Sequence, residues 1–230
     1  MKPNFVDLTT AHLADACLRL QVRPRCLSLQ PVSDGQRLAG PARPVQHFGS
    51  VDVFLEAIDR ANVGDVLVVD NGGRLDEACI GDLVAIEAKA AGLAGIVVWG
   101  KHRDTAEIRQ VELPVFSLGS IATGPIRLDE RNFSAFDLAR FGNFLITTAD
   151  YVAADDDGVI FLPRERVDRI REQAASIRDT EIKQAAMVEE GRSLRSQMRF
   201  ADYLQRRLTD PNLTFRDHLQ NLEAEIEVRF

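Results

Sequence analysis

A glycine followed by an acid stands where a loop is predicted to turn into a helix. Residues 80–84 read Ile-Gly-Asp-Leu-Val, and the apolar spacing after them predicts a helix from about residue 81 to residue 91. The first amides of a helix have no partners inside it, and with the helix dipole they attract a carboxylate or a phosphate. Gly81 would let such an anion approach the backbone. Asp82 has a second interpretation as the N-cap of the helix, which this segment taken alone favours.

A second polar segment, Gly-Lys-His-Arg-Asp at residues 100–104, directly follows a predicted strand. Ligands of open α/β folds bind beyond the carboxyl ends of the strands. The guanidinium of Arg103 can fork onto a planar carboxylate. Asp104 offers a hard oxygen ligand to Mg²⁺, which keeps several waters and takes few protein carboxylates. The alternative is a surface Arg–Asp pair in which Asp104 caps the next helix.

The two segments are more informative together than apart. Both lie past strands and both begin helices, so adjacent parallel strands would bring them to the same place. A backbone anion site, an arginine and a metal-binding aspartate would then converge. Such a set suits a 2-oxo acid, because a cation and Arg103 polarise the ketone and hold the carboxylate. The cation also stabilises the enolate that forms when a carbon–carbon bond breaks.

The elements that position these segments alternate between strand and helix. Continuous apolar runs predict buried strands, and helical periodicity predicts helices between them. This alternation indicates an α/β class with a largely parallel central element, followed by a β-rich section with an Asp-Gly turn at residues 157–158. The predicted strands are residues 66–70, 94–99, 115–118, 144–146, 151–153 and 159–163, and the helices are residues 51–61, 81–91 and a short one ending at 108.

The start of the chain is expected to hold one helix and several short strands. Residues 8–18 read as a helix capped by Thr9 or Thr10. Strand-like pieces follow at 25–29, 38–42 and 45–48, separated by proline and glycine. In the helix at 51–61, Val51, Phe54, Leu55 and Ile58 are expected to share the buried face.

From residue 164 the composition changes to that of helices. Val167, Ile170, Ala174 and Ile177 recur at steps of three and four, and further helical stretches follow around residues 194–204 and 215–226. We therefore expect a core domain at residues 1–163 and a helical C-terminal extension at 164–230. The apolar stripe of the extension needs a surface to cover it. That surface is either a neighbouring subunit or the core of the same chain.

Composition and charge exclude several classes of protein. The 230 residues carry a formal charge of −7 with acids and bases interleaved, which argues against nucleic acid as a partner. No apolar run is long enough for a membrane span and no leader is visible, so we expect a cytoplasmic protein. The three scattered cysteines argue against a disulfide framework and a structural zinc site.

The order of these motifs resembles the RraA-like family, which includes the metal-dependent class II pyruvate aldolases. The resemblance covers roughly residues 8 to 165. Its motifs are Val-Val-Asp-Asn-Gly-Gly at 68–73, Ile-Gly-Asp-Leu at 80–83, the strand and glycine at 94–100, Arg103-Asp104, Leu-Pro-Val-Phe-Ser at 113–117, and Ala-Asp-Asp-Asp-Gly-Val-Ile-Phe-Leu-Pro at 154–163.

The resemblance implies a fold, an assembly and roles for named residues. The fold would be a swivelling β/β/α domain assembled as a homotrimer or homohexamer, with sites between subunits. Arg103 would bind the carboxylate and keto oxygen of the substrate, and Asp104 would hold Mg²⁺ or Mn²⁺. The amides at Gly81, Asp82, Leu83 and Val84 would bind the pyruvate carboxylate, and Asp82 would position a proton-shuttling water. A glutamate of the neighbouring subunit would complete the metal site, and Glu181 is the candidate chosen over Glu189 and Glu190.

Two functions follow from the resemblance and a third is rejected. The first is metal-dependent cleavage of a 4-hydroxy-2-oxo acid, of the 4-hydroxy-4-methyl-2-oxoglutarate type, to pyruvate and a second oxo acid, with decarboxylation of oxaloacetate as a side activity. The alternative is a non-catalytic regulator that binds a ribonuclease, as RraA proteins do. A methyltransferase is rejected because residues 71–73 lack the wider glycine pattern of a dinucleotide-type loop. Lys101 and His102 are expected to be solvated and structural respectively, rather than catalytic.

Overall fold

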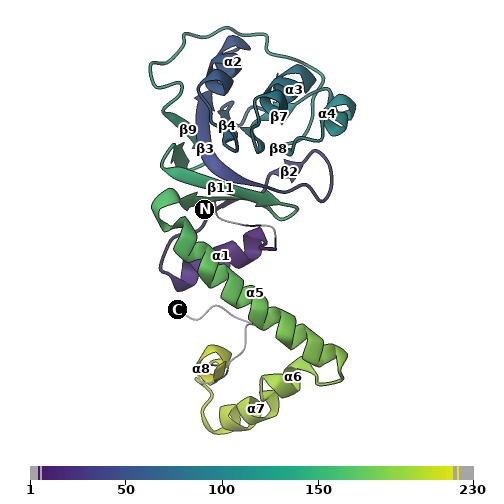
Figure 1. Cartoon of the computed structure of the whole chain (residues 1–230). Coiled ribbons are helices and arrows are strands. Elements are labelled where there is room, and N and C mark those ends of the chain that lie inside the picture. The colour runs from purple at the N-terminus through teal and green to yellow at the C-terminus, as the bar shows by residue number, and fades with distance from the viewer. Residues whose placement is uncertain (1–4, 6, 220–221, 223–230) are drawn as a thin grey trace. The chain divides into compact units, whose positions relative to one another are not determined.

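The computed structural model describes residues 5, 7–219 and 222 (Figure 1). The chain forms two compact units, one of Pro24–Val167 and one of Met1–Arg23 with Asp168–Phe230. The expected boundary at residue 164 lies close to the junction at 167. The first 23 residues, however, group with the helical extension and not with the core, where we expected them.

An eight-stranded mixed sheet forms the frame of the 24–167 unit, in the order β1-β12-β11-β3-β4-β6-β8-β2. Strands β3, β4, β6 and β8 run parallel, which confirms the predicted parallel element. The other four pair antiparallel. The strands are β1 (Arg25–Leu27), β2 (Gln30–Pro31), β3 (Leu38–Gln46), β4 (Val66–Asp70), β6 (Gly95–Trp99), β8 (Val115–Ser117), β11 (Asp150–Asp155) and β12 (Gly158–Pro163).

Strand β3 joins the two halves of this sheet and corrects one expectation. We expected two pieces separated by Pro44, but β3 is continuous and changes partner in its middle. Its first part pairs antiparallel with β11 and its second part parallel with β4. Proline has no backbone N–H to donate to a neighbouring strand. Pro41 faces β11 and Pro44 faces β4, so each of the two strand pairings contains only one proline of β3. Proline's fixed φ is also compatible with extended backbone.

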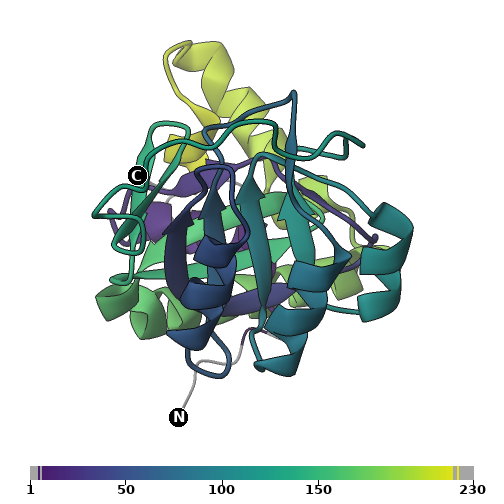
Figure 2. The same ribbon diagram turned by 90° about the horizontal axis from the view of Figure 1, so that it is seen from above.

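Three helices cover one face of the parallel strands, namely α2 (Asp52–Asp59), α3 (Asp82–Ala90) and α4 (Thr105–Val111) (Figures 1 and 2). Because successive side chains of a strand point to opposite faces, Leu67 and Val69 pack under these helices, whereas Val66 and Val68 belong to a second core on the other face. Both faces are therefore buried, which explains the continuous apolar runs of the parallel strands.

The helices bury narrower stripes than their sequences suggested. Helix α2 buries Val53, Phe54, Ala57 and Ile58, while Val51 and Leu55 are about half exposed. Helix α3 buries Val84, Ala85 and Ala88 and leaves Leu83 and Ile86 exposed. The small alanine side chains lie on the sheet side of α3. The larger apolar residues are thus left on the surface of this chain.

Two small sheets complete the 24–167 unit. Strands β9 (Leu138–Phe141) and β10 (Phe144–Thr147) form an antiparallel pair. Strands β5 (Ala78–Ile80) and β7 (Lys101–His102) form a parallel pair that the sequence did not indicate. The predicted Asp-Gly turn is confirmed between β11 and β12, where Asp155 faces Gly158 and Gly158 has a φ of 124°.

The second unit is helical, which confirms the predicted extension. Helix α1 (Thr10–Arg19) begins with Thr9 as its N-cap, whose hydroxyl accepts the N–H of His12 at 3.2 Å. The other helices are α5 (Val167–Glu189), α6 (Leu194–Gln197), α7 (Phe200–Thr209) and α8 (Phe215–Leu219). The predicted stripe of α5 is buried at Ile170, Ala174 and Ile177. The last part of the stretch expected at 215–226 lies outside the described residues, apart from Leu222. None of the helices in the described part of the chain combines the length and apolarity that crossing a bilayer requires.

We predict that Phe116→Ala lowers the free energy of unfolding by about 3–5 kcal/mol, because it empties a fully buried site in the sheet. The matched control is Phe133→Ala, since that ring is 106% exposed, and it should change stability by less than about 0.5 kcal/mol. Denaturant unfolding followed by circular dichroism measures both. Equal losses for the two variants would contradict the assigned core.

Candidate functional site

The two polar segments singled out in the sequence meet through the pairing of β5 with β7. Ala78 faces Lys101 and Ile80 faces His102, and the amide of Arg103 donates to the carbonyl of Ile80 at 2.9 Å. The helix start at Asp82 and the Arg103-Asp104 pair therefore lie side by side. The expected convergence is confirmed, although a small separate sheet produces it and not adjacent strands of the main sheet.

Gly81 is the closest point between the two segments. It is the N-cap of α3, with extended backbone at φ −130° and ψ −171°, so its conformation is open to any residue. A Cβ added there, however, would collide with the Asp104 carboxylate. The glycine is required for this close approach and not for its backbone conformation.

Asp82 is not the N-cap that its position suggested. It is the first residue of α3, and its Oδ1 accepts the N–H of Leu83 at 2.7 Å. One of the amides that we expected at the anion site is therefore occupied by the neighbouring carboxylate in this structure. An incoming anion would have to replace Asp82 at the Leu83 amide or use the amides on either side.

Asp104 does not cap its helix either. It stands at the N-cap position of α4, but its side chain makes no capping hydrogen bond. Its backbone is left-handed, with φ 57° and ψ 44°, which costs on the order of 1–3 kcal/mol for a residue with a side chain. This conformation places the carboxylate against Gly81 and 3.4 Å from Nε of Arg103. The expected Arg–Asp pair is thus present, half exposed at Arg103 and 38% exposed at Asp104.

Both segments line one pocket of about 350 Å³. This volume lies within the range of small-molecule sites. The lining combines the start of α3, the Arg103-Asp104 pair and the loop after β3. Its residues are His47, Gly49, Val51, Ala78, Cys79, Gly81, Asp82, Leu83, Val84, Arg103, Asp104 and Pro125.

The donor set at Asp104 suits a magnesium-type ion better than a zinc-type ion. Within the described residues, no three histidine, cysteine or acidic side chains cluster as a metal site. Asp104 supplies one uncapped carboxylate, and Mg²⁺ is held in proteins by one or two carboxylates while it keeps several waters. Zinc sites use three or four protein ligands. The residues present therefore fit a largely hydrated Mg²⁺ or Mn²⁺ ion.

Glu181, the expected second metal ligand, lies on α5 in the helical unit. Its Oε2 is 2.8 Å from Nε2 of His12, whose Nδ1 faces the Thr9 amide at 3.1 Å. Because the Thr9 amide donates to Nδ1, the proton of the ring is on Nε2 and is donated to Glu181. Since Glu181 was expected to act across a subunit boundary, its role at the metal stays a prediction.

His47 lines the pocket and was missed in the sequence. It directly follows β3, and its amide donates to the carbonyl of Asp70 at 2.9 Å. Burial lowers the pKa of its imidazole, against a smaller opposing effect of the hydrogen bond with Asn71. The available signal was its place at the carboxyl end of a strand beside the parallel sheet. We had assigned residues 45–48 wholly to a strand, which hid that signal.

The remaining polar groups of these segments are structural. His102 is buried and uses both ring nitrogens, facing the Ser117 hydroxyl at 2.8 Å and the Thr105 hydroxyl at 3.0 Å. This bonding is consistent with the structural role expected for it. Burial strongly raises the pKa of the Cys79 thiol, so this pocket residue is no nucleophile near neutral pH.

The comparisons with known proteins agree on one family. Residues 10–161 match the RraA-like family model, described as Aldolase/RraA. A Burkholderia multivorans protein named "Putative 4-hydroxy-4-methyl-2-oxoglutarate aldolase" is 35% identical over 158 residues, which are 67% of this chain and 92% of that protein. Protein DlpA of Legionella pneumophila is 29% identical over 198 residues, 83% of this chain. The chain spans only 32% of the length of DlpA.

Solved structures show the same fold. RraAS2 of Streptomyces coelicolor, described as an unusual member of the RNase ES inhibitor RraA family, has a TM-score of 0.66 at 28% identity, covering 76% of this chain and 89% of that one. A Geobacillus kaustophilus protein described as an S-adenosylmethionine:2-dimethylmenaquinone methyltransferase has a TM-score of 0.57 at 30% identity, covering 65% and 93%. Since the family model matches well over half of the residues, the chain belongs to the RraA-like (Aldolase/RraA) family and has its α/β fold.

Proposed function

We propose that this protein cleaves a 4-hydroxy-2-oxo acid, of the 4-hydroxy-4-methyl-2-oxoglutarate type, to pyruvate and a second oxo acid in a reaction that depends on Mg²⁺ or Mn²⁺. The observation that carries the proposal is the Asp104 carboxylate, turned away from its own helix and placed between Gly81 and the Arg103 guanidinium. The aldolase name of the Burkholderia relative supports it.

The substrate is proposed to bind with its carboxylate at the start of α3. There the free amides and the helix dipole favour an anion. Arg103 is half exposed beside the same pocket, so its guanidinium is free to fork onto the carboxylate and the 2-oxo oxygen. The contact of Arg103 with the 2-oxo oxygen strengthens as negative charge develops on that oxygen, which is the condition for catalysis.

Asp104 would hold the ion, with water in most of its other coordination positions. When bound, the ion supplies Lewis acidity toward the 2-oxo group. Asp82 lies at the start of α3 with its carboxylate on the Leu83 amide. When the substrate takes that amide, the Asp82 carboxylate becomes free to order the water that returns a proton to the pyruvate enolate. Oxaloacetate decarboxylation, the proposed side activity, would use the same enolate.

A regulatory role is the second candidate, because the fold of RraAS2 is similar. Under that hypothesis the chain would bind a ribonuclease and release no pyruvate from any oxo acid. A methyltransferase is not favoured by the geometry. The glycines after β4 form a turn in which the Gly73 amide donates to the Trp99 carbonyl at 3.0 Å, and a Cβ at Gly73 would meet the Trp99 ring. The close packing against Trp99 therefore accounts for Gly73 without a cofactor.

We predict that Arg103→Ala and Asp104→Asn each lower kcat/KM for pyruvate release at least about 100-fold, because each removes charge stabilisation of the enolate. The matched control from the same segment is Lys101→Ala, which should stay within about twofold. Among the described residues, the amine of Lys101 makes only a long contact with the Ser120 carbonyl, at 3.4 Å. A lactate-dehydrogenase-coupled assay with and without EDTA measures all three. Cleavage that survives EDTA and both substitutions would rule out the mechanism.

We predict that the Gly81→Ala variant loses most of its pyruvate-releasing activity while the chain remains folded. The backbone there is extended and tolerates alanine, but the added methyl group would displace the Asp104 carboxylate. Isothermal titration with Mn²⁺ should show weakened binding, in parallel with the lost activity. Wild-type metal affinity together with wild-type activity would show that the close approach has no functional role.

The assembly is proposed to be a homotrimer or homohexamer with Glu181 of one subunit acting at Asp104 of the next. The apolar side chains that α3 leaves exposed, Leu83 at 74% and Ile86 at 49%, support burial by a neighbouring copy. In this arrangement Glu181 would exchange its contact with His12 for one near the metal.

We predict that Glu181→Gln and Asp104→Asn are each inactive alone but complement each other after mixing. Random reassembly of shared sites in a cyclic oligomer restores about a quarter of the wild-type activity. The measurement is pyruvate release after unfolding and refolding the two variants together, with light scattering for the mass. A monomer, or mixing that restores nothing, would contradict a site shared through Glu181.

A further inference from the structure

His47 is a buried imidazole at the wall of the pocket, and the function proposed above gives it no role. The residue is 8% exposed and its ring stacks on Phe54, with centroids 5.0 Å apart. The loop after β3 carries it to the same pocket as Asp82 and Arg103. Packing on one face and hydrogen bonding at one edge fix the orientation of the ring.

The contacts of Asn71 determine which nitrogen of His47 carries the proton. The Asn71 side-chain oxygen lies 2.8 Å from Nδ1 of His47, and Arg127 donates to the same oxygen at 3.0 Å. An atom that receives a guanidinium donor is an acceptor, so Nδ1 must be the protonated nitrogen. The neutral ring then has its lone pair on Nε2.

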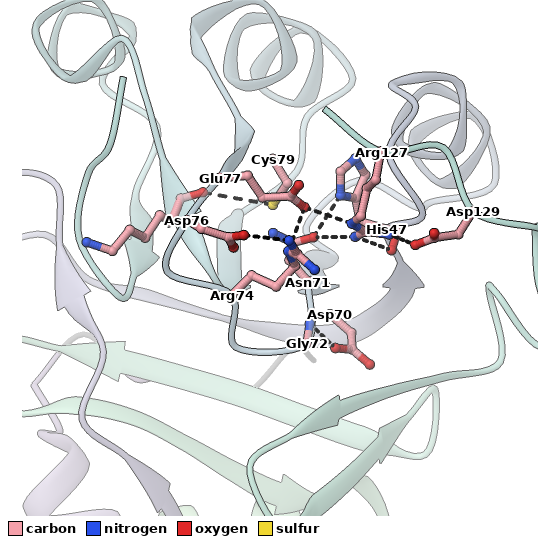
Figure 3. A network of polar contacts seen from close by, with 11 residues as sticks. His47, Asp70, Asn71, Gly72, Arg74, Asp76, Glu77, Cys79, Arg127 and Asp129 are labelled. Carbon is pink, nitrogen blue, oxygen red and sulfur yellow. Dashed lines mark hydrogen bonds and ion pairs between the residues drawn. The ribbon is translucent and has the colours of Figure 1, made fainter. Parts of the chain in front are cut away.

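A chain of charged groups holds Asn71 in this orientation (Figure 3). Arg127 donates from Nε to the Glu77 carboxylate at 3.1 Å and also contacts the Asp129 carboxylate and, at 3.3 Å, the His47 carbonyl. Glu77 is 1% exposed, so this ion pair is shielded from water. Burial is the largest influence on the pKa of His47 and lowers it, and the Arg127 cation lowers it further. The hydrogen bond with Asn71 and the carboxylates of Glu77 and Asp129 raise this pKa by smaller amounts. The imidazole is therefore neutral at neutral pH.

The Nε2 nitrogen is free for a ligand. No partner for it occurs within the described residues, and it is not among the fully buried side-chain atoms that lack a partner. It therefore retains access to solvent, and the residue lines the pocket. His102, the other histidine of these segments, has both nitrogens occupied and offers no such lone pair.

We propose that His47 is the general base of the cleavage, accepting the proton of the substrate's 4-hydroxyl group at Nε2. The inference rests on the proposed retro-aldol function and adds a residue to it. As the O–H proton passes to Nε2, the C4–O bond becomes a carbonyl and the C3–C4 bond breaks. Its electron pair enters the enolate of pyruvate beside Arg103. The imidazolium then returns its proton, through water, to C3 of the enolate, so the cycle needs no oxidant or reductant.

The first experiment compares His47→Asn with Asn71→Asp in the full chain. Asparagine at 47 keeps a donor for Asn71 but has no base at the Nε2 position, so kcat should fall about 10²–10⁴-fold. In wild type, kcat/KM falls as the pH drops through the pKa of His47, because the protonated ring cannot accept a proton. In Asn71→Asp the anionic acceptor stabilises the imidazolium, so this acid limb should move to higher pH. A His47→Asn variant with unchanged kcat and the same acid limb would overturn the proposal.

The second experiment separates this proposal from the function it rests on. Nitrogen-15 spectra of histidine-labelled protein contain only four histidines, and the His47 signal is the one that His47→Asn removes. We expect the His47 signal to show the Nδ1–H tautomer. With EDTA present to remove metal ions, 4-hydroxy-4-methyl-2-oxoglutarate should shift the nitrogen-15 resonance of Nε2. 2-Oxoglutarate, which lacks the hydroxyl group, should leave this resonance unchanged.

The outcomes of the two experiments differ for the two hypotheses. A shift without any cleavage by the metal-loaded wild type would reject the aldolase function and keep the hydroxyl contact. Cleavage without a shift, with His47→Asn fully active, would reject the base and keep the aldolase. If neither the Nε2 shift nor cleavage is observed, both the general base and the aldolase function are rejected.

Discussion

The close approach of the Asp104 carboxylate to the backbone of Gly81 is the contact on which the candidate site depends. It joins two segments that are more than twenty residues apart, and it exists only because residue 81 has no side chain. The left-handed backbone of Asp104 and the pairing of β5 with β7 bring the carboxylate to that point. Since a free carboxylate beside a guanidinium and a helix start is a suitable set for a metal and an oxo acid, the proposed chemistry follows from this one contact.

The parallel half of the fold was predictable because its strands carry continuous apolar runs. Leu67 and Val68 point to opposite cores. A strand that is buried on both faces carries apolar residues at every position, and such a continuous run is recognisable in the sequence. Strand β3 was not predictable as one element. Pro44 reads as a break between two strand pieces, whereas β3 runs through it and changes partner between Pro41 and Pro44. Local sequence has no signal for such a change, because it arises from pairing with strands far away in the chain.

The candidate site was predictable in its residues but not in its details. Asp82 and Asp104 both stand at helix starts, and the capping interpretation of each was wrong. Gly81 takes the cap position of α3, and Asp104 stands at the cap position of α4 but makes no capping hydrogen bond with its side chain. His47 was missed because it follows a strand with no motif around it. Its importance comes from Asn71 and Arg127, which only the folded chain brings together.

The grouping of the first helix with the last ones has a consequence for how the chain is made. Residues 24–167 form a unit that is complete in sequence before most of α5 has been synthesised, so it is able to fold while the ribosome is still at work. Helix α1 is synthesised before residues 24–167, yet Glu181, its partner through His12, is synthesised after them. The contact of His12 with Glu181 therefore cannot form until the 24–167 unit has been made, and the Thr9 capping box is the local device that supports helix α1 during that interval.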